Sequence, residues 1–281
     1  MIPVSVVIPA RNAAREIAPT LGALAGVDVV VAVNGSSDST AEVARTYGAT
    51  AVVLERPSRP AARNLGAAAA AGERLLFTDV GCVPEPGWVE RLSACLEEAP
   101  LAGGPVRVRT RTKPGVAERF DALWRFQQER AVREGGWSAG ANLGITRDAF
   151  ERIGGFDERL TAGDDVDLCI RARRLDFTIG WCAAAAVAHP ASRTLGEVCR
   201  RAVRQGSSST TLARRFDAEV GRLHWHHPGG IVRGGAALRA LGVDPGSLDP
   251  AERRRMAMVA RLDYAGRFAG SLWADVVRRS G

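Results

Sequence analysis

Short apolar runs alternate with amphipathic stretches through the first part of the chain. The runs are rich in Val, Ile and Leu and end at turn residues, which is typical of strands buried on both faces of a sheet. The stretches between them carry apolar residues at helical spacing, as in Ile17, Leu21 and Leu24. This alternation predicts an α/β fold, a mostly parallel sheet with helices on both faces. The expected strands span residues 4–8, 27–33, 51–54 and 75–79.

The regular alternation ends near Pro100. Beyond it the pattern predicts a half-exposed strand, an amphipathic helix, a Gly-rich extended segment, an acid-capped helix, a strand and a basic helix, at residues 106–110, 116–132, 138–146, 164–175, 177–188 and 195–216. We expect residues 1–216 to form one domain, and residues 217–281 to form a helical C-terminal extension packed on it.

The composition favours a single large globular domain with an appendage. The chain has 281 residues, of which 46% are hydrophobic, enough for a sizeable core. Its longest apolar run, residues 177–188, is too short to span a bilayer, and we expect no signal peptide because no basic leader precedes the first strand. The five Cys residues are an odd, scattered set without a C-x-x-C pair, which indicates reduced thiols rather than disulfides or a zinc site. These features predict a cytoplasmic protein.

The net charge of +7 comes from basic residues that are all Arg except Lys113. A solvated, Arg-rich surface explains this excess without a charged partner. Nucleic-acid binding would rest on the charge alone, since no recognisable motif or aromatic stacking platform accompanies it, and we expect no nucleic-acid partner. The first strand is followed by Pro9-Ala10-Arg11-Asn12 and not by G-x-G-x-x-G, which argues against a dinucleotide-dependent oxidoreductase.

Acidic residues occur at two places where ligand-binding or catalytic residues are often found. Asp79 ends a buried strand, and ligands of open α/β sheets bind beyond the carboxyl ends of the strands. Asp164, Asp165 and Asp167 lie in the first turn of an expected helix, where the helix dipole favours negative charge. Each group also has a structural explanation, because such residues commonly cap a turn or a helix.

Six segments in a fixed order bear on this choice. Together they resemble the motifs of the family 2 inverting glycosyltransferases, which have the Rossmann-like GT-A fold. The segments are residues 4–12, 34–40, 63–66, 78–82, 154–158 and 163–168. Each is a weak signal alone, but their order and spacing along residues 4–210 are specific.

The resemblance implies transfer of a sugar from a nucleotide-diphosphate donor to a hydroxyl acceptor, with inversion. It implies Asp165 as the general base that deprotonates the acceptor hydroxyl. The residues implied for nucleotide-sugar binding are Pro9, Arg11, Asn34, Ser36, Arg63 and Asp79. The residues implied for the acceptor side are Asp164, Gly140 and Arg204.

The chain departs from the family pattern at two places. Val33-Asn34 stands where the family usually has two Asp, which puts its usual uridine preference in doubt. Gly81 replaces the second Asp of the Asp-x-Asp motif. A divalent cation, Mg²⁺ or Mn²⁺, would then be held by Asp79 with His189 as a second candidate ligand. Two alternatives stay open: His189 as a structural hydrogen-bonding group, and diphosphate neutralisation by arginines such as Arg204.

The two departures also support a different function. A degenerate GT-A domain could bind a nucleotide or a protein partner without catalysis. For the enzyme, the acceptor could be a glycan, a lipid or a natural product. The basic last segment, residues 253–279, could rest on the inner face of a membrane, pack on the main domain or join two subunits of a homodimer.

Overall fold

The computed structural model describes residues 2–216 and 249–279, which belong to two compact units. The first unit contains the chain up to Arg107 together with Gln128–His189, and the second contains Val108–Gln127 and the chain from Pro190 onward. The boundary expected after residue 216 falls at the end of a helix inside the second unit. Residues 217–248 and 280–281 of the expected C-terminal extension lie outside the described residues.

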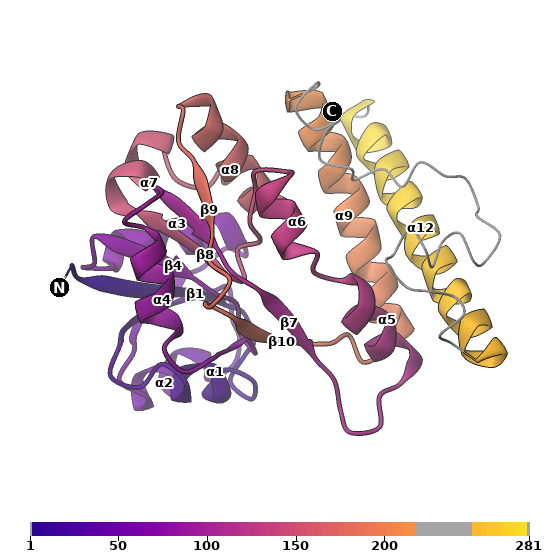
Figure 1. Cartoon of the computed structure of the whole chain (residues 1–281), viewed down its shortest axis with the longest axis horizontal. Coiled ribbons are helices and arrows are strands. Elements are labelled where there is room, and N and C mark those ends of the chain that lie inside the picture. Colours follow the sequence, from indigo (N-terminus) through magenta and orange to yellow (C-terminus); the bar gives the residue numbers. More distant parts are fainter. Residues whose placement is uncertain (1, 217–248, 280–281) are drawn as a thin grey trace. The chain divides into compact units, whose positions relative to one another are not determined.

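A seven-stranded sheet forms the centre of the first unit, with helices around it (Figure 1). Its strands are β1 (Val4–Ala10), β2 (Asp28–Asn34), β3 (Thr50–Leu54), β4 (Arg74–Phe77), β6 (Leu101–Gly103), β8 (Leu143–Thr146) and β9 (Ile179–Trp181). In the order β3-β2-β1-β4-β8-β6-β9, β8 alone runs antiparallel to its neighbours. The prediction of a mostly parallel sheet flanked by helices is confirmed.

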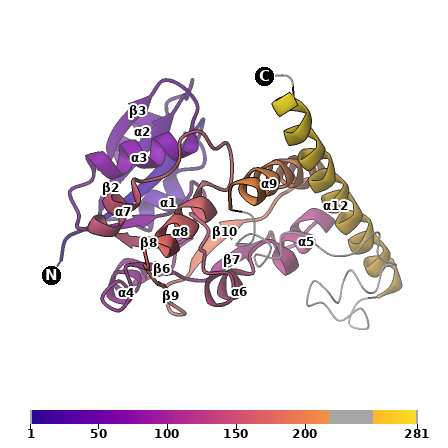
Figure 2. The same ribbon diagram turned by 90° about the horizontal axis from the view of Figure 1, so that it is seen from above.

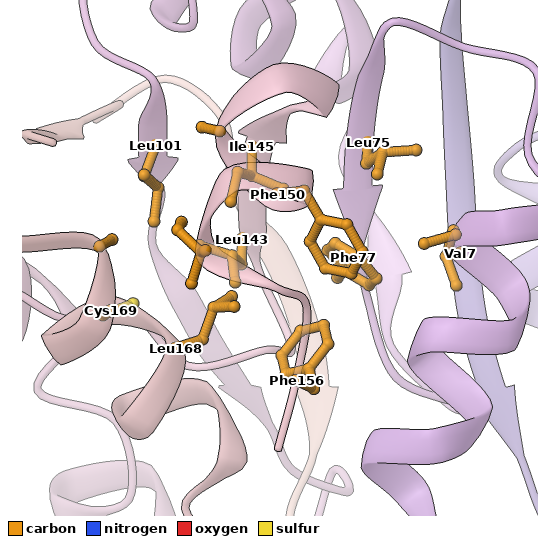
Figure 3. Close-up of a cluster of buried hydrophobic side chains, with 14 of the residues drawn as sticks. Val7, Leu75, Phe77, Leu101, Leu143, Ile145, Phe150, Phe156, Leu168 and Cys169 are labelled. Atoms are coloured by element: carbon orange, nitrogen blue, oxygen red, sulfur yellow. The ribbon is translucent and has the colours of Figure 1, made fainter. Parts of the chain in front are cut away.

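The main core lies on the face of this sheet that α3, α7 and α8 cover. The helices of the unit are α1 (Ala18–Gly22), α2 (Thr40–Thr46), α3 (Arg59–Ala69), α4 (Trp88–Cys95), α6 (Gln128–Arg133), α7 (Arg147–Ile153) and α8 (Asp164–Arg174). Alternation along β4 directs Leu75 and Phe77 to this face. The Phe77 ring packs against those of Phe150 and Phe156, with centroids 5.8 and 5.1 Å apart (Figure 3). This core fixes β4 against the start of α8.

A second, three-stranded sheet brings a distant strand to the loop that follows β4. Its strands, in the order β5-β10-β7, are β5 (Val83–Pro84), β10 (Val187–Pro190) and β7 (Val106–Arg109). Val83 pairs with Ala188, so His189 comes next to the loop that begins at Asp79. The strand expected at 177–188 is therefore two short strands, β9 and β10, which belong to different sheets.

The second unit contains the helices α5 (Val116–Trp124), α9 (Leu195–Phe216) and α12 (Pro250–Arg279). Figures 1 and 2 both show α9 and α12 side by side. Glycines allow this close packing. A Cβ on Gly206 of α9 would lie 1.9 Å from the Arg267 carbonyl oxygen, and one on Gly270 of α12 would lie 1.9 Å from the Val203 carbonyl oxygen. The expectation of a helical C-terminal segment is met by α12.

The expectation that all cysteines are reduced is wrong. Cys95 at the end of α4 and Cys182 just after β9 form a disulfide, although 87 positions separate them along the chain. The sheet brings them together, since α4 packs on β6 and β6 pairs with β9, and sequence spacing cannot reveal that contact. Cys82, Cys169 and Cys199 are free. Cysteine usage therefore no longer argues for a reducing compartment, and the expected cellular location stays a prediction.

None of the helices in the described ranges is both long and apolar enough to cross a membrane.

Candidate active site

Several of the residues expected at the site lie at one edge of the large sheet, where the parallel strands β1, β2 and β4 have their carboxyl ends. Pro9 is buried within the end of β1, and Arg11 follows it with an exposed side chain. Asn34 ends β2. Asp79 lies two residues beyond β4, with its side chain 27% exposed.

Arg63 of α3 is the centre of a buried charge cluster. Its Nη1 donates to Asp164 Oδ2 at 2.5 Å, and its Nη2 donates to Asp79 Oδ1 at 3.0 Å. The guanidinium also lies over the Phe156 ring, 5.3 Å from the centroid. Burial opposes the charged form of Arg63, but Asp164, Asp79 and then Asp165 raise its pKa. One arginine thus holds the strand-end carboxylate and the first residue of α8 together.

The position of Gly140 requires glycine. A Cβ there would lie 2.4 Å from Arg63 Nη2 and 2.6 Å from Cζ of the same guanidinium, whose burial leaves it no room to withdraw. The backbone N–H of Gly140 donates to Asp165 Oδ2 at 2.9 Å. Gly140 therefore both accommodates Arg63 and orients the acidic side chain beside it.

Asp165 has the properties of a base. Its Oδ2 accepts from Gly140, and its Oδ1 accepts from the Val166 N–H at 2.9 Å. Burial first and then the Asp164 charge raise the pKa of Asp165, while Arg63 opposes the rise. A fixed, half-buried carboxylate with a raised pKa can accept a proton from a bound hydroxyl group.

Asp79 differs from Asp165. Burial raises the pKa of its carboxyl group, but Arg63, Arg59 and His189 together lower the pKa below its ordinary value. Asp79 is therefore an ionised, partly exposed carboxylate, and the buried His189 imidazole lies within its electrostatic range.

These two side chains fit a divalent cation only as part of a ligand set. Among the described residues, no group of three or more His, Cys, Asp or Glu side chains has an arrangement that could hold a metal. Asp79 and His189 offer one oxygen and one nitrogen, and a bound substrate would have to supply further oxygens. That is the usual situation for Mg²⁺ at phosphate sites, where protein carboxylates are few.

The turn after β2 is tied down by its own side chains. Asn34 Oδ1 accepts from the Ser58 N–H at 2.6 Å, just before α3 begins. Ser36 Oγ accepts from the Asn12 N–H at 2.9 Å, which joins this turn to the loop after β1. Val33 is 3% exposed, so it belongs to the core. The oxygens of Asn34 and Ser36 thus already have partners within the protein.

Known proteins are similar to this chain in sequence and in fold. The model of the family described as "Glycosyltransferase like family 2" matches residues 3–208. Glycosyltransferase AglE of Haloferax volcanii is 30% identical over 218 residues, which cover 72% of this chain and 71% of AglE. The chain belongs to glycosyltransferase family 2. This confirms the resemblance expected from the six ordered motifs.

Two further comparisons concern length and fold. The pre-mycofactocin glycosyltransferase of Mycobacterium tuberculosis is 28% identical, and the match covers 98% of this glycosyltransferase but 63% of the relative. The mannosyltransferase PcManGT from Pyrobaculum calidifontis, solved with GDP-Man and Mn²⁺, superposes with a TM-score of 0.67 at 19% identity over 97% of this chain and 87% of its own. TarS of S. aureus superposes with a TM-score of 0.57 at 16% identity, over 96% of this chain and 55% of its own. The fold is GT-A.

The structure of this glycosyltransferase unites some of the expected site residues. Asp79, Arg63, Asp164, Asp165 and Gly140 form one connected cluster. Arg204 is exposed on α9 in the second unit, which is described by itself, and its acceptor-side role stays a prediction.

The sequence interpretation missed Arg59, which influences the pKa of both Asp79 and Asp165. Its spacing of four residues from Arg63 was the available signal, because side chains at i and i+4 share a helix face.

Proposed function

We propose that this glycosyltransferase moves a sugar from a nucleoside-diphosphate donor to a hydroxyl acceptor with inversion, and that Asp165 is the general base. One observation carries the proposal: Asp165 is held by the Gly140 N–H beside the cluster of Arg63, Asp79 and Asp164, and its pKa is raised. The raised pKa of Asp165 and the lowered pKa of Asp79 give the two carboxylates different roles.

The chemistry needs one proton transfer and one displacement. The acceptor hydroxyl gives its proton to the Asp165 carboxylate. Its oxygen forms a bond to the anomeric carbon from the side opposite the diphosphate. The bond between that carbon and the diphosphate oxygen breaks, and the nucleoside diphosphate leaves. Asp164 supports this step because its charge raises the pKa of Asp165, and Gly140 supports it because its N–H fixes the orientation of the carboxylate.

The leaving diphosphate needs neutralisation. We propose that Asp79 and His189 hold a Mg²⁺ or Mn²⁺ ion together with diphosphate oxygens, and that the ion when bound offsets the negative charge of the leaving group. The structural neighbour PcManGT was solved with GDP-Man and Mn²⁺, which supports a cation at this kind of site. The partly exposed, ionised Asp79 is suited to face it.

The loops at the same edge of the sheet bind the donor. Arg11 is exposed there, and the backbone around Pro9 and Ser36 borders the edge. The side chain of Arg63 serves instead to orient carboxylates, since it is 1% exposed and both of its Nη atoms donate to carboxylates of the protein. The acceptor is a hydroxyl compound, and a product screen over glycans, lipids and natural products identifies its class.

Replacement of the base tests the proposal. We expect Asp165→Asn to lower the transfer rate by about 10²–10⁴-fold, because the amide cannot take the proton. The affinity for the nucleoside diphosphate, measured by calorimetry, should stay within about threefold of wild type, because Asp165 acts on the acceptor hydroxyl. Such a change corresponds to less than about 1 kcal/mol. Asp148→Asn is the matched control, because that carboxylate is 76% exposed on α7.

Two results would contradict the assignment. Full transfer activity in Asp165→Asn would remove the base. A wild-type protein that binds nucleotides but turns over no sugar nucleotide would favour the non-catalytic alternative.

A further inference from the structure

Beside the charge cluster at the sheet edge lies a second arginine of α3, Arg59, for which the described residues provide no ion pair. Asp79, Asp164 and Asp165 surround Arg63, which is 1% exposed and engaged in two ion pairs. Arg59 lies on α3 one turn before Arg63, on the same face of the helix. It is half-buried, and within the described ranges its guanidinium makes no hydrogen bond or ion pair.

The position of Arg59 is defined by the start of α3. Ser58 is the N-cap, and its Oγ accepts from the Ala61 N–H at 3.3 Å. Asn34 Oδ1 fixes the Ser58 N–H in turn, so the first turn of α3 is tied to the end of β2. Arg59 is the first residue of that helix, at the carboxyl edge of the sheet. Its charge there is within range of both Asp79 and Asp165.

We propose that Arg59 binds the diphosphate of the donor. This rests on the proposed function and assigns a residue that the ordered motifs do not include. An arginine offers a planar, permanently charged set of donors that suits phosphate oxygens. The amino end of α3 adds partial positive charge to the same place. Arg63 is less suited to this role, because its side chain is 1% exposed and its two Nη atoms donate to carboxylates.

The departure at Gly81 gives this cation more importance. Gly81 stands in place of the second Asp of the Asp-x-Asp motif, so Asp79 is the carboxylate of that motif that remains. A bound metal therefore has fewer protein ligands. A diphosphate placed at this edge would lie beside the guanidinium of Arg59, whose charge already acts on Asp79 and Asp165. The negative charge of the leaving group would then be neutralised in part by the metal ion and in part by the guanidinium of Arg59.

Calorimetry with nucleoside diphosphates and monophosphates of the same base tests this inference. The probes are a panel of nucleoside diphosphates, among them GDP and UDP, and the matching monophosphates, each with Mn²⁺ and with EDTA. We expect Arg59→Gln to lower the affinity for the diphosphate by about tenfold or more, as loss of a charge-assisted hydrogen bond does. The affinity for the monophosphate should fall by less than about threefold, and the loss of diphosphate affinity should be the same in EDTA.

Two further variants complete the test. Arg45→Gln is the matched control, because Arg45 is exposed in the last turn of α2. That turn precedes the amino end of β3, whereas the site lies at the carboxyl ends of the strands. Arg59→Lys should recover part of the diphosphate affinity, and thermal unfolding should show that each variant is folded.

The outcomes separate the two claims. Equal losses for diphosphate and monophosphate, an effect confined to Mn²⁺, or no loss relative to Arg45→Gln would overturn the role of Arg59 while the proposed function stands. Failure of the wild-type protein to bind any nucleoside diphosphate would overturn the proposed function, and the inference with it.

Discussion

Asp165 differs from an ordinary surface aspartate because burial and the neighbouring Asp164 raise its pKa. A base works only when it is deprotonated, so activity is complete above that raised pKa and is lost as the pH falls through it. Asp79, with its lowered pKa, stays ionised over the same range.

We therefore expect kcat/KM to fall on the acid side with a midpoint above the ordinary aspartate pKa of about 3.9. The pH profile of transfer, measured with saturating Mn²⁺, checks this. A profile that stays flat down to the onset of acid unfolding would contradict the base role.

Gly140 should be intolerant of any side chain. The added methyl group of Gly140→Ala would lie 2.4 Å from Arg63 Nη2 and would force the buried guanidinium away from its carboxylates. We expect a loss of about 1–3 kcal/mol in the free energy of unfolding and a fall in the transfer rate of at least tenfold. Gly22→Ala is the control, since nothing lies within 4 Å of a Cβ at that position. Equal stability and activity in the two variants would show that the guanidinium relaxes freely.

At the residue scale the sequence named Asp79 and Asp165 as candidates but did not reveal how their side chains are held. Asp79 and Asp165 stand in ordered motifs that are visible along the chain. The bridging role of Arg63 and the cation at Arg59 depend on where α3 lies against the start of α8, and that packing is not local in sequence.

At the scale of elements, local pattern was a good guide to the strands at the start of the chain. Runs such as 4–8 and 27–33 are β-branched and buried, so their strand identity follows from their own residues. The segment 177–188 is also apolar, yet it divides between two sheets because β9 pairs with β6 and β10 pairs with β5. Pairing partners decide such cases.

The disulfide is the element-scale feature with a direct test. It joins the end of α4 to the segment after β9 and closes a loop of 87 residues. We expect Cys182→Ser to lower the free energy of unfolding by about 2–5 kcal/mol, measured by denaturant titration without reductant. Wild-type protein in reductant should match the variant. Titration of all five thiols in unfolded, unreduced wild-type protein would contradict the bond.

At the scale of the whole molecule, the first unit carries the described carboxylate cluster, and the second is a helical unit built on α5, α9 and α12. The family 2 match ends at residue 208, within α9. The α12 helix lies beyond it, so its role is not set by the family resemblance. The chemistry assigned to Asp165 needs only groups of the first unit.

The anomeric configuration of the product tests the central claim most directly. The purified protein is supplied with Mn²⁺, a sugar nucleotide that it turns over and the acceptor found by product screening, and the new linkage is examined by proton NMR. An in-line attack assisted by the Asp165 carboxylate predicts a product of opposite anomeric configuration to the donor, with one nucleoside diphosphate released per linkage formed. A product that retains the donor configuration would contradict it.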